Sequence, residues 1–439
     1  MSKNNGRIQS KITIYDKVVL EVLDRSTNLS LVLSTFDKSV NKYFESENLD
    51  PQFGAKVQIF KPGRLKTYDG PEITEWNEIN EDSYILTVKQ IHVPINFSIE
   101  NLIYDMKNLE DRVIKPAVNA IVEKQERDAI AELTTATGFF VGSATAPLTE
   151  DVLNSAASIL TKADAPNGQD DRFAVLNSTA SSQLKKSMKS TFNPAKTVSD
   201  LFSDVKTDFR AYGFACMDSN YLPYHQSGTA CNVDNIVVAN LIDSTRIKVT
   251  GLTKTLNPGD KFVITDSSNN AVMFSTDKNR DTGLPMGFSV VSVAGDVITF
   301  SPELKTEDSH GLNFNVSRGL KAGDGLIFAM TAGESAVYSV AYSKYSPKYV
   351  SFPASRITDA LKNTGAKVIT KTDEKIGDSI SMWSDASLEK FSQMTRFDKF
   401  YGFKVSKPEH CIVLISNTKE VVSSMGDIVA KGLKVVSGK

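Results

Sequence analysis

An alternation of apolar and polar residues over residues 53–98 predicts a ribbon of two antiparallel strands. On the outgoing half, Ala55, Val57 and Ile59 occupy every second position, which is typical of a strand. Proline and glycine then punctuate a polar excursion, at Pro62, Gly63, Gly70 and Pro71. The pattern therefore predicts a long hairpin with a charged tip of about twenty residues.

The returning half of this ribbon changes phase. Its first apolar face consists of Tyr84, Leu86 and Val88. The alternation then continues, shifted by one position, at Ile91, Val93 and Ile95. Such a shift predicts a β-bulge near Gln90 that bends the strand. Because an isolated two-stranded ribbon is only marginally stable in water, we expect its faces to rest on a neighbour.

A helical pattern follows the ribbon. Apolar residues at helical spacing form one stripe, which comprises Leu109, Val113, Ile114, Val118, Ile121, Val122, Ile130 and Leu133. Pro116 interrupts this stripe, and proline is tolerated in the first turn of a helix. We therefore expect a helix of about twenty residues that starts near Pro116 and is about 30 Å long.

The remaining segments predict further mixed structure. Helical and strand patterns alternate over residues 148–222, beginning with Thr149 as an N-cap. Residues 232–330 contain short strands separated by turn residues such as those of "NPGDKF" and "GDGLIF", which predicts a small β-barrel or sandwich. Because the mixed pattern resumes near Glu334, this all-β module is an insertion. The apolar segment from Val18 to Phe36 has little before it to pack on and is interpreted as an arm.

Composition places the chain among ordinary globular proteins. It has 439 residues, of which 41% are hydrophobic and 23% charged, and its net charge is -2. This balance argues against a dedicated nucleic-acid binder, which usually carries an excess of basic residues. The three cysteines are widely spaced and contain no CxxC pair, so buried thiols in a reducing cytosol are expected rather than a zinc site. No window of the sequence is apolar enough to predict a membrane span.

Candidate catalytic residues are scarce. None of the four histidines lies in an HxxxH or HExxH pattern, and nucleophile elbows, P-loops and dinucleotide fingerprints do not occur in the sequence. His92 lies within a predicted strand, where a structural role is favoured over a ligand role. The sequence therefore predicts no enzyme activity, no catalytic residues, no cofactor and no metal site.

Charge is concentrated on the excursion of the ribbon. Lys61, Arg64 and Lys66 are followed by Asp69 and Glu72 on the same segment. Opposite charges on one exposed ribbon suit pairing with an equivalent neighbour, and a solvated loop explains them equally well.

Several stretches, in their order along the chain, resemble the major capsid proteins of tailed bacteriophages. The resemblance is closest to the coat proteins of short-tailed Salmonella-type phages, which carry an inserted telokin-like domain. The stretches are "GAKVQIFKPGRLKTYDG", "RVIKPAVNAI", "LNPGDKFVI", "NNAVMFSTDKNRDTGLPMGFSVVSVAGDVITFSP", "LKAGDGLIFAM" and "TRFDKFYGFKVSKPEHCIVL". The last one is similar to the Arg-x-Asp-x-x-Tyr-Gly strand region of that family.

The resemblance implies an α+β tailed-phage capsid fold with an inserted all-β telokin-like domain. The implied parts are an N-terminal arm (1–50), an extended loop (51–98), a peripheral domain with the spine helix (99–147), a first part of the axial domain (148–230), the inserted β-barrel (231–333), a second part of the axial domain (334–395) and a return to the peripheral domain (396–439). It also implies contacts between subunits, through the charged ribbon and through Asp277, Arg280 and Asp281 in the barrel.

A protein of this family would build the icosahedral shell around the double-stranded DNA genome. The resemblance implies assembly in the bacterial host cytoplasm through a scaffold-dependent procapsid that matures by conformational change into the virion. Its partners would be other copies of the chain in pentamers and hexamers, a scaffolding protein, a portal protein, a decoration protein in some relatives, and packaged DNA without sequence-specific binding. No membrane partner is implied. Gly138, Gly142 and Gly402 are candidates for hinge flexibility.

Other classes of protein stay open on the sequence alone. An encapsulin-like cargo shell shares the fold but usually lacks the insertion. An enzyme with an inserted β domain would need a nucleophile and a base brought together from distant residues. A tail-tube or surface β protein is disfavoured by the long predicted helix.

Overall fold

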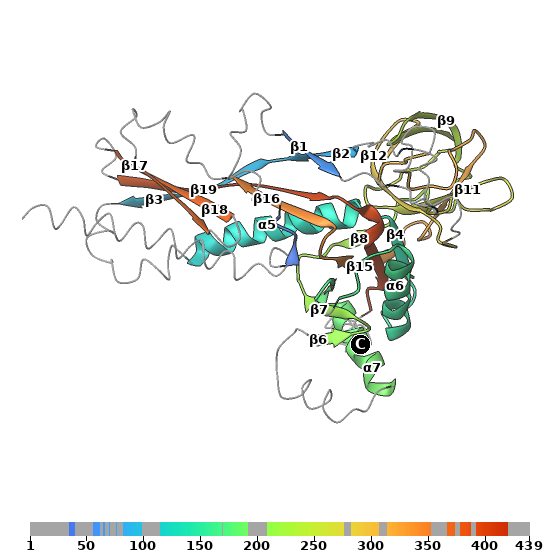
Figure 1. Cartoon of the computed structure of the whole chain (residues 1–439), viewed down its shortest axis with the longest axis horizontal. Coiled ribbons are helices and arrows are strands. Elements are labelled where there is room, and N and C mark those ends of the chain that lie inside the picture. The colour runs from blue at the N-terminus through green and yellow to red at the C-terminus, as the bar shows by residue number, and fades with distance from the viewer. Residues whose placement is uncertain are drawn as a thin grey trace, which may run out of the picture. The chain divides into compact units, whose positions relative to one another are not determined.

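A computed structural model of the chain (Figure 1) describes residues 35–39, 56–61, 65, 70, 76, 82–98, 115–168, 170–191, 209–275, 282–306, 314–352, 367–373, 378–387 and 392–419. The chain divides into two units. The first unit comprises Met1–Phe60, Ser83–Glu132 and Pro347–Ser406, and the second comprises Lys61–Asp82, Leu133–Ser346 and Lys407–Lys439. Within the described residues the elements are three α-helices and several sheets, which is an α+β fold.

A five-stranded antiparallel sheet forms the centre of the first unit. Its strands are β16 (Pro347–Phe352), β19 (Ser392–Val405), β18 (Asp378–Ser387), β17 (Lys367–Asp373) and β3 (Lys89–Ser98). The order is β16-β19-β18-β17, and β3 also pairs with β19. Strand β19 is long enough to pair with β3 and β18 along its first part and with β16 along its last part.

Helix α5 (Lys115–Thr135) packs on one face of this sheet, as Figure 1 shows. The helix has 21 residues, and Pro116 is its second residue, so the predicted start and length are confirmed. The buried stripe of α5 contacts apolar side chains of β18 and β19; the cluster contains Ala117, Val118, Ile121, Val122, Ile380, Met382 and Phe397. Of the predicted stripe, Leu109, Val113 and Ile114 lie outside the described residues.

The predicted ribbon is present as β1 (Lys56–Lys61) paired with β2 (Asp82–Thr87). The predicted bulge near Gln90 is wrong, because β3 pairs with β19 in unbroken register from Lys89 to Ser98. The change of phase has another cause. The chain leaves one sheet at Thr87 and joins another at Lys89, so different faces are buried on either side of Val88.

Alternation along β3 follows this new partner. Ile91, Val93 and Ile95 pack against the cluster beneath α5, whereas His92 is exposed. His92 is therefore a surface residue of a strand, and the structure gives it neither a buried structural role nor a ligand role.

The N-terminal segment contributes one described stretch to the first unit. Asp37 accepts a hydrogen bond from the amide of Tyr349 at 3.0 Å and donates its own amide to Pro347 O at 3.0 Å. Phe36 packs edge-to-face on Phe403 with ring centroids 5.6 Å apart. The predicted arm thus has at least one docking place on β16 within its own chain. The rest of residues 1–50 lies outside the described part of the chain.

A seven-stranded mixed sheet forms the body of the second unit. Its order is β4-β20-β15-β5-β7-β6, and β8 also pairs with β15. The strands are β4 (Phe139–Gly142), β5 (Arg172–Leu176), β6 (Phe209–Ala211), β7 (Phe214–Asp218), β8 (Tyr224–Gln226), β15 (Ser335–Ser343) and β20 (Cys411–Asn417). Helices α6 (Glu150–Lys162) and α7 (Ser178–Thr191) belong to the same unit. Thr149 is the N-cap of α6, as predicted, although its side chain makes no capping bond.

A closed six-stranded barrel occupies the chain between β8 and β15. Its order is β10-β13-β12-β11-β14-β9, and its strands are β9 (Val237–Asp243), β10 (Arg246–Thr250), β11 (Lys261–Thr265), β12 (Gly287–Ala294), β13 (Val297–Ser301) and β14 (Gly325–Phe328). Of the two architectures predicted for this segment, the barrel is the one found. Barrel side chains such as Phe262 and Phe274 share one continuous apolar core with Phe139, Leu160 and Ile412 of the body.

Candidate functional site

The residues predicted to contact other subunits fall almost entirely outside the described part of the chain. Lys61 is described only by its backbone, as the last residue of β1. The other members of the set lie among the residues without a described structure: Arg64, Lys66, Asp69, Glu72, Asp277, Arg280 and Asp281. The proposed contacts at these positions therefore remain predictions.

Two apolar side chains on the same excursion were missed by the sequence reasoning. Trp76 is 82% exposed and Leu65 is 63% exposed. Tryptophan is concentrated at the energetic centres of protein interfaces. The available signal was the presence of two large apolar residues in a segment otherwise rich in charge.

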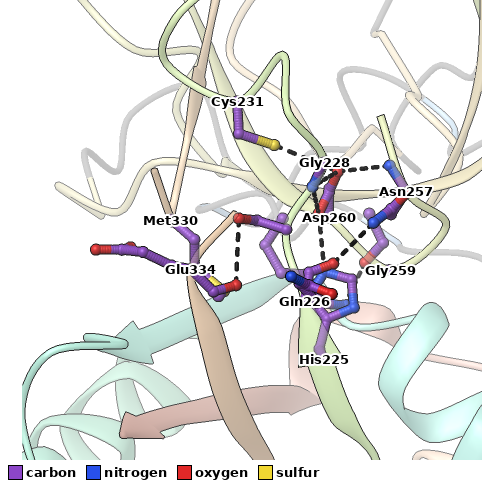
Figure 2. A network of polar contacts seen from close by, with 12 residues as sticks. His225, Gln226, Gly228, Cys231, Asn257, Gly259, Asp260, Met330 and Glu334 are labelled. Carbon is purple, nitrogen blue, oxygen red and sulfur yellow. Dashed lines mark hydrogen bonds and ion pairs between the residues drawn. The ribbon is translucent and has the colours of Figure 1, made fainter. Parts of the chain in front are cut away.

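Buried polar groups gather where the barrel joins the sheet of the second unit (Figure 2). Asp260 precedes β11 and accepts hydrogen bonds from the backbone amides of Asn257 at 2.8 Å and Gly228 at 3.2 Å. Its carboxylate also accepts from His225 Nε2 at 2.8 Å and from Cys231 Sγ at 3.3 Å. Because these donors come from β8, from the loop after β8 and from the turn before β11, one carboxylate fixes the path of three segments.

The exit from the barrel is tied to the same place. The amide of Ser227 donates to Glu334 O at 2.9 Å. The hydroxyl of Tyr338 donates to Gly259 O at 3.3 Å, and its ring stacks on His225 with centroids 4.8 Å apart. Figure 2 shows Glu334 and Gly259 near His225 and Asp260. The chain therefore enters the barrel after β8 and leaves it before β15 at the same place. We call this group of polar contacts around Asp260 the stem.

The polar groups of the stem hold segments together and do not form a catalytic site. Burial and the neighbouring carboxylate of Asp260 raise the pKa of the Cys231 thiol well above its usual range, so this thiol stays protonated. A reactive cysteine needs a lowered pKa or an adjacent base. His225 is bonded to Asp260, and the thiol donates to the same carboxylate. Cys231, His225 and Asp260 are the residue types of a cysteine hydrolase. In this arrangement, however, they do not activate the sulfur, because His225 and the thiol both bond to the carboxylate and not to each other.

A second buried polar cluster joins α5 to its sheet in the first unit. Lys399 Nζ donates to Asp378 Oδ2 at 2.6 Å, and the hydroxyl of Tyr349 donates to Asp378 Oδ1 at 2.6 Å. Gln125 of α5 lies 3.4 Å from the same ammonium through its Oε1. Burial raises the pKa of Asp378, but the charge and hydrogen bond of Lys399 outweigh it, and the pKa falls below its usual range. The cluster is therefore an ion pair that links α5, β16, β18 and β19.

The stretch "RFDKFYG" supplies several specific contacts of the first unit. Arg396 binds Asp398 through two nitrogens, at 2.5 and 2.7 Å. Tyr401 donates to Asp128 of α5 at 2.9 Å. A Cβ at Gly402 would lie 2.4 Å from Leu86 Cδ2 and 2.7 Å from the carbonyl oxygen of Thr87. Gly402 is thus required by the close passage of β2, which differs from the expected hinge role.

The other two glycines expected to act as hinges are also packing positions. Gly138 donates its amide to Pro408 O at 2.9 Å, and a Cβ there would lie 2.9 Å from that oxygen. Gly142 has a φ of 106° and pairs with Ile415 across β4 and β20, where a Cβ would lie 2.1 Å from the carbonyl oxygen. Both positions are held by neighbouring backbone.

Among the described residues, no group of three or more His, Cys, Asp or Glu side chains could hold a metal ion. In the same part of the chain, no helix is long and apolar enough to cross a membrane. The described residues thus define an α+β protein whose buried polar clusters join structural elements.

Residues 87–255 match a family model described as "Phage capsid protein". This segment runs from the end of β2, through α5 and the helices of the second unit, into the barrel. The match agrees with the resemblance found in the sequence. No curated protein matches the chain.

Solved structures of phage particles are similar to the chain at low identity. Mycobacterium phage Che8 is 13% identical, with a TM-score of 0.43, over 88% of this chain and 90% of that one. The capsid of Ralstonia phage GP4 is 8% identical, with a TM-score of 0.45, over 84% and 86%. The capsid of Helicobacter pylori bacteriophage KHP30 is 10% identical, with a TM-score of 0.41, over 84% and 86%.

Proposed function

We propose that this chain is the major capsid protein of a tailed bacteriophage, and that its copies assemble into the closed shell that encloses the double-stranded DNA genome. The observation that carries the proposal is the match of residues 87–255 to phage capsid proteins. The buried clusters support it, because they join elements and leave the thiol of Cys231 inert. The protein then acts by assembly and has no enzyme activity.

Assembly of this kind rests on many copies of modest interfaces, each with an apolar centre and a polar rim. Rigid subunits suit this purpose because little conformational freedom is lost when they associate. The ion pair of Lys399 and Asp378 under α5, and the stem at Asp260, both restrict movement within a unit. These joints favour a subunit that keeps its shape when it meets its neighbours.

The partners follow from the proposed role. Other copies of the chain form pentamers and hexamers, a scaffolding protein guides a procapsid, and a portal protein occupies the site of DNA packaging. A decoration protein on the outer surface is a further candidate. Packaged DNA is enclosed without sequence-specific contacts, which is compatible with the net charge of -2. The protein functions in the virion after assembly in the host cytoplasm.

A finer assignment concerns the barrel. Its position between β8 and β15 supports the proposal that it is the telokin-like insertion of the short-tailed Salmonella-type coat proteins. On this assignment residues 1–50 are the N-terminal arm, 51–98 the extended loop, 99–147 with 396–439 the peripheral domain, and 148–230 with 334–395 the axial domain. These bounds differ from the two units of the structure, in which β16, β17 and β18 share a sheet with β19, and β20 belongs to the sheet of the second unit.

The proposed contacts between copies lie on the extended loop and in the barrel. The charged members are Lys61, Arg64, Lys66, Asp69, Glu72, Asp277, Arg280 and Asp281. The exposure of Trp76 and Leu65 adds an apolar component to the loop. Apolar anchors surrounded by charge are the usual composition of an interface centre and its rim.

Particle formation tests the main proposal. The full chain, expressed with and without a scaffolding protein, should give large closed particles in negative-stain electron microscopy. A species that stays monomeric at high concentration in both conditions would contradict the proposal.

Charge reversal tests the loop. Replacement of Lys61, Arg64 and Lys66 by Glu should reduce particle yield while the melting temperature of the monomer changes little. Reversal of Asp69 and Glu72 to Lys in the same chain is the matched control, because it restores opposite charges on the two partners of a contact. The charges do not pair between copies if the first variant loses monomer stability. The same conclusion follows if the variant with all five substitutions does not recover particle yield.

Substitution of Trp76 separates apolar anchoring from charge. Trp76→Ala should lower particle yield, and Trp76→Phe should retain most of it, because a large aromatic surface is conserved. Equal yields for both variants and the wild type would exclude Trp76 as an anchor.

A further inference from the structure

The segment from the end of α5 to the start of β4 contacts the barrel at three separate points. We call residues 134–140 the seat. The first contact is a buried side chain, the second a backbone hydrogen bond, and the third a pair of aromatic rings. All three join residues that are more than a hundred positions apart in the chain, and all lie within the second unit.

Lys261 makes the first contact. This side chain leaves β11, and its residue is only 3% exposed. Its ammonium donates to the carbonyl oxygen of Thr134, to Thr137 Oγ1 at 3.0 Å, and to Ser289 Oγ of β12. Three donors therefore meet three acceptors, two on the seat and one on the barrel. A positive charge next to the carbonyl end of a helix is also favoured by the helix dipole.

A pair of glycines makes the second contact. The amide of Gly287, at the start of β12, donates to Gly138 O at 2.8 Å. A Cβ at Gly287 would lie 3.0 Å from Phe140 Cδ1 and 3.1 Å from that oxygen. Because Gly138 is itself held against Pro408, the two backbones can approach this closely only where neither residue carries a side chain.

Aromatic rings make the third contact. Phe139 of β4 packs edge-to-face on Phe274 of the barrel, with centroids 5.3 Å apart. Both rings belong to the core that the barrel shares with the body of the second unit. The apolar contact supplies attraction, but it tolerates small shifts and rotations because burial is not directional.

We propose that Lys261 is a latch that holds the barrel in a single position on the end of α5. A buried ammonium without acceptors is strongly unfavourable. If the barrel moves off the seat, Lys261 loses the acceptors on Thr134 and Thr137 while Ser289 moves with it. Intermediate positions are therefore disfavoured, and the barrel is either seated or free. The stem tethers the barrel, and Lys261 determines its orientation.

The latch is a property of the folded subunit and does not depend on assembly into a shell. Its failure and the failure of the capsid proposal are therefore separate outcomes. The measurement is amide hydrogen exchange of the full chain, with peptides that separate Leu133–Phe140 from the barrel core around Phe262 and Phe288. Exchange reports local opening of a segment without global unfolding.

Three variants and one control define the test. Lys261→Met keeps the length of the side chain and removes the charge, and it should raise exchange in Leu133–Phe140 about tenfold, as expected for lost hydrogen bonds to a charged group. Ser289→Ala removes one acceptor and should give a smaller rise. Gly287→Ala pushes the same surfaces apart with Lys261 intact, and should also raise exchange there. Lys248→Met replaces an exposed lysine of β10 and should change nothing.

The barrel core decides the interpretation. Unchanged exchange around Phe262 and Phe288 in Lys261→Met, together with faster exchange in the seat, supports the latch. Equal acceleration in both regions would mean that Lys261 stabilises the barrel itself, and the proposal would be wrong. Unchanged exchange in the seat would also overturn it. If Lys261→Met does not fold, Gly287→Ala decides the question by the same two criteria.

Discussion

Asp260 and Asp378 are equally buried, each only 2% exposed, but they are stabilised by different kinds of partner. Asp260 in the stem is held by two backbone amides, together with the ring of His225 and the thiol of Cys231. Asp378 under α5 is held by the ammonium of Lys399 and the hydroxyl of Tyr349. Backbone donors fix the path of a loop, whereas side-chain donors fix the packing of elements whose backbones are already formed.

The difference has a consequence for substitution. Both partners of an ion pair can be replaced together, and such replacement by groups of similar volume is often tolerated. Backbone amides cannot be removed by substitution, so the loss of Asp260 leaves them buried without an acceptor. A third arrangement, at Lys261, is the counterpart of the stem, because there a buried cation is held by neutral acceptors.

Removal of Asp260 should have the largest effect. Asp260→Ala leaves the amides of Gly228 and Asn257 without their acceptor, and we expect it to lower the free energy of unfolding of the second unit by about 4 kcal/mol. Urea denaturation measures the loss. Asp266→Ala is the control, since Asp266 accepts amides in an exposed turn. A loss no larger than that of the control would show that the stem does not fix the barrel.

Removal of Lys399 should have a slightly smaller effect. Lys399→Met takes the ammonium away from the buried carboxylate of Asp378, and we expect a loss of about 3 kcal/mol in the first unit. The double variant Asp378→Asn with Lys399→Met should lose less than Lys399→Met alone, because it buries no charge. Denaturation of the wild type, of Asp378→Asn, of Lys399→Met and of the double variant forms a double-mutant cycle. Additive losses would mean that the two groups stabilise the unit independently, which would contradict the hydrogen bond between Lys399 and Asp378.

His225→Phe removes one donor of several from Asp260. The phenyl ring can keep the stacking on Tyr338, and the backbone donors remain. We therefore expect a loss of about 1.5 kcal/mol, that of one hydrogen bond to a charged group. His92→Phe, at an exposed position of β3, should have almost no effect in the same thermal or urea measurement. A loss as large as that of Asp260→Ala would mean that His225 provides most of the stabilisation of the stem.

The pH dependence of stability should report the protonation of Lys261. Burial lowers the pKa of Lys261 from 10.5 to about 7. Between these two values the unfolded chain binds more protons than the folded one, so stability rises with pH. Relative to Lys261→Met, the wild type should gain about 1 kcal/mol from pH 7 to pH 8. A difference that stays constant over this range, measured by urea denaturation, would mean that Lys261 keeps its proton in the fold.

Much of the fold could be predicted because periodicity reports burial directly. The stripe that continues through Val118 and Ile121 predicted α5, and turns at regular intervals predicted the barrel. The start of the helix at Pro116 followed from the geometry of proline. The β-bulge near Gln90 was predicted wrongly, since a change of buried face has the same pattern whether a residue is inserted or the strand changes its partner at Val88.

The polar clusters were much harder to predict. "NPGDKF" was interpreted as a turn between strands, and it is one, but its Asp260 and Lys261 are both buried. A charged residue has the same one-letter code whether it is buried or exposed, so the local sequence does not distinguish the two cases. Their partners lie far away along the chain, such as Thr134 for Lys261 and Gln125 for Lys399. Local pattern carries no information about such distant contacts.

The sequence by itself determined the elements, their order and the face that each one buries, because these follow from side-chain spacing and from the backbone limits of proline and glycine. Only the tertiary structure decided which elements meet. It placed Gly402 under Leu86 and Gly287 against Gly138, and it turned ordinary charged residues into the joints at Asp260, Asp378 and Lys261. The physical reason is that a buried polar group is stable only beside its partner, and the fold alone brings the two together.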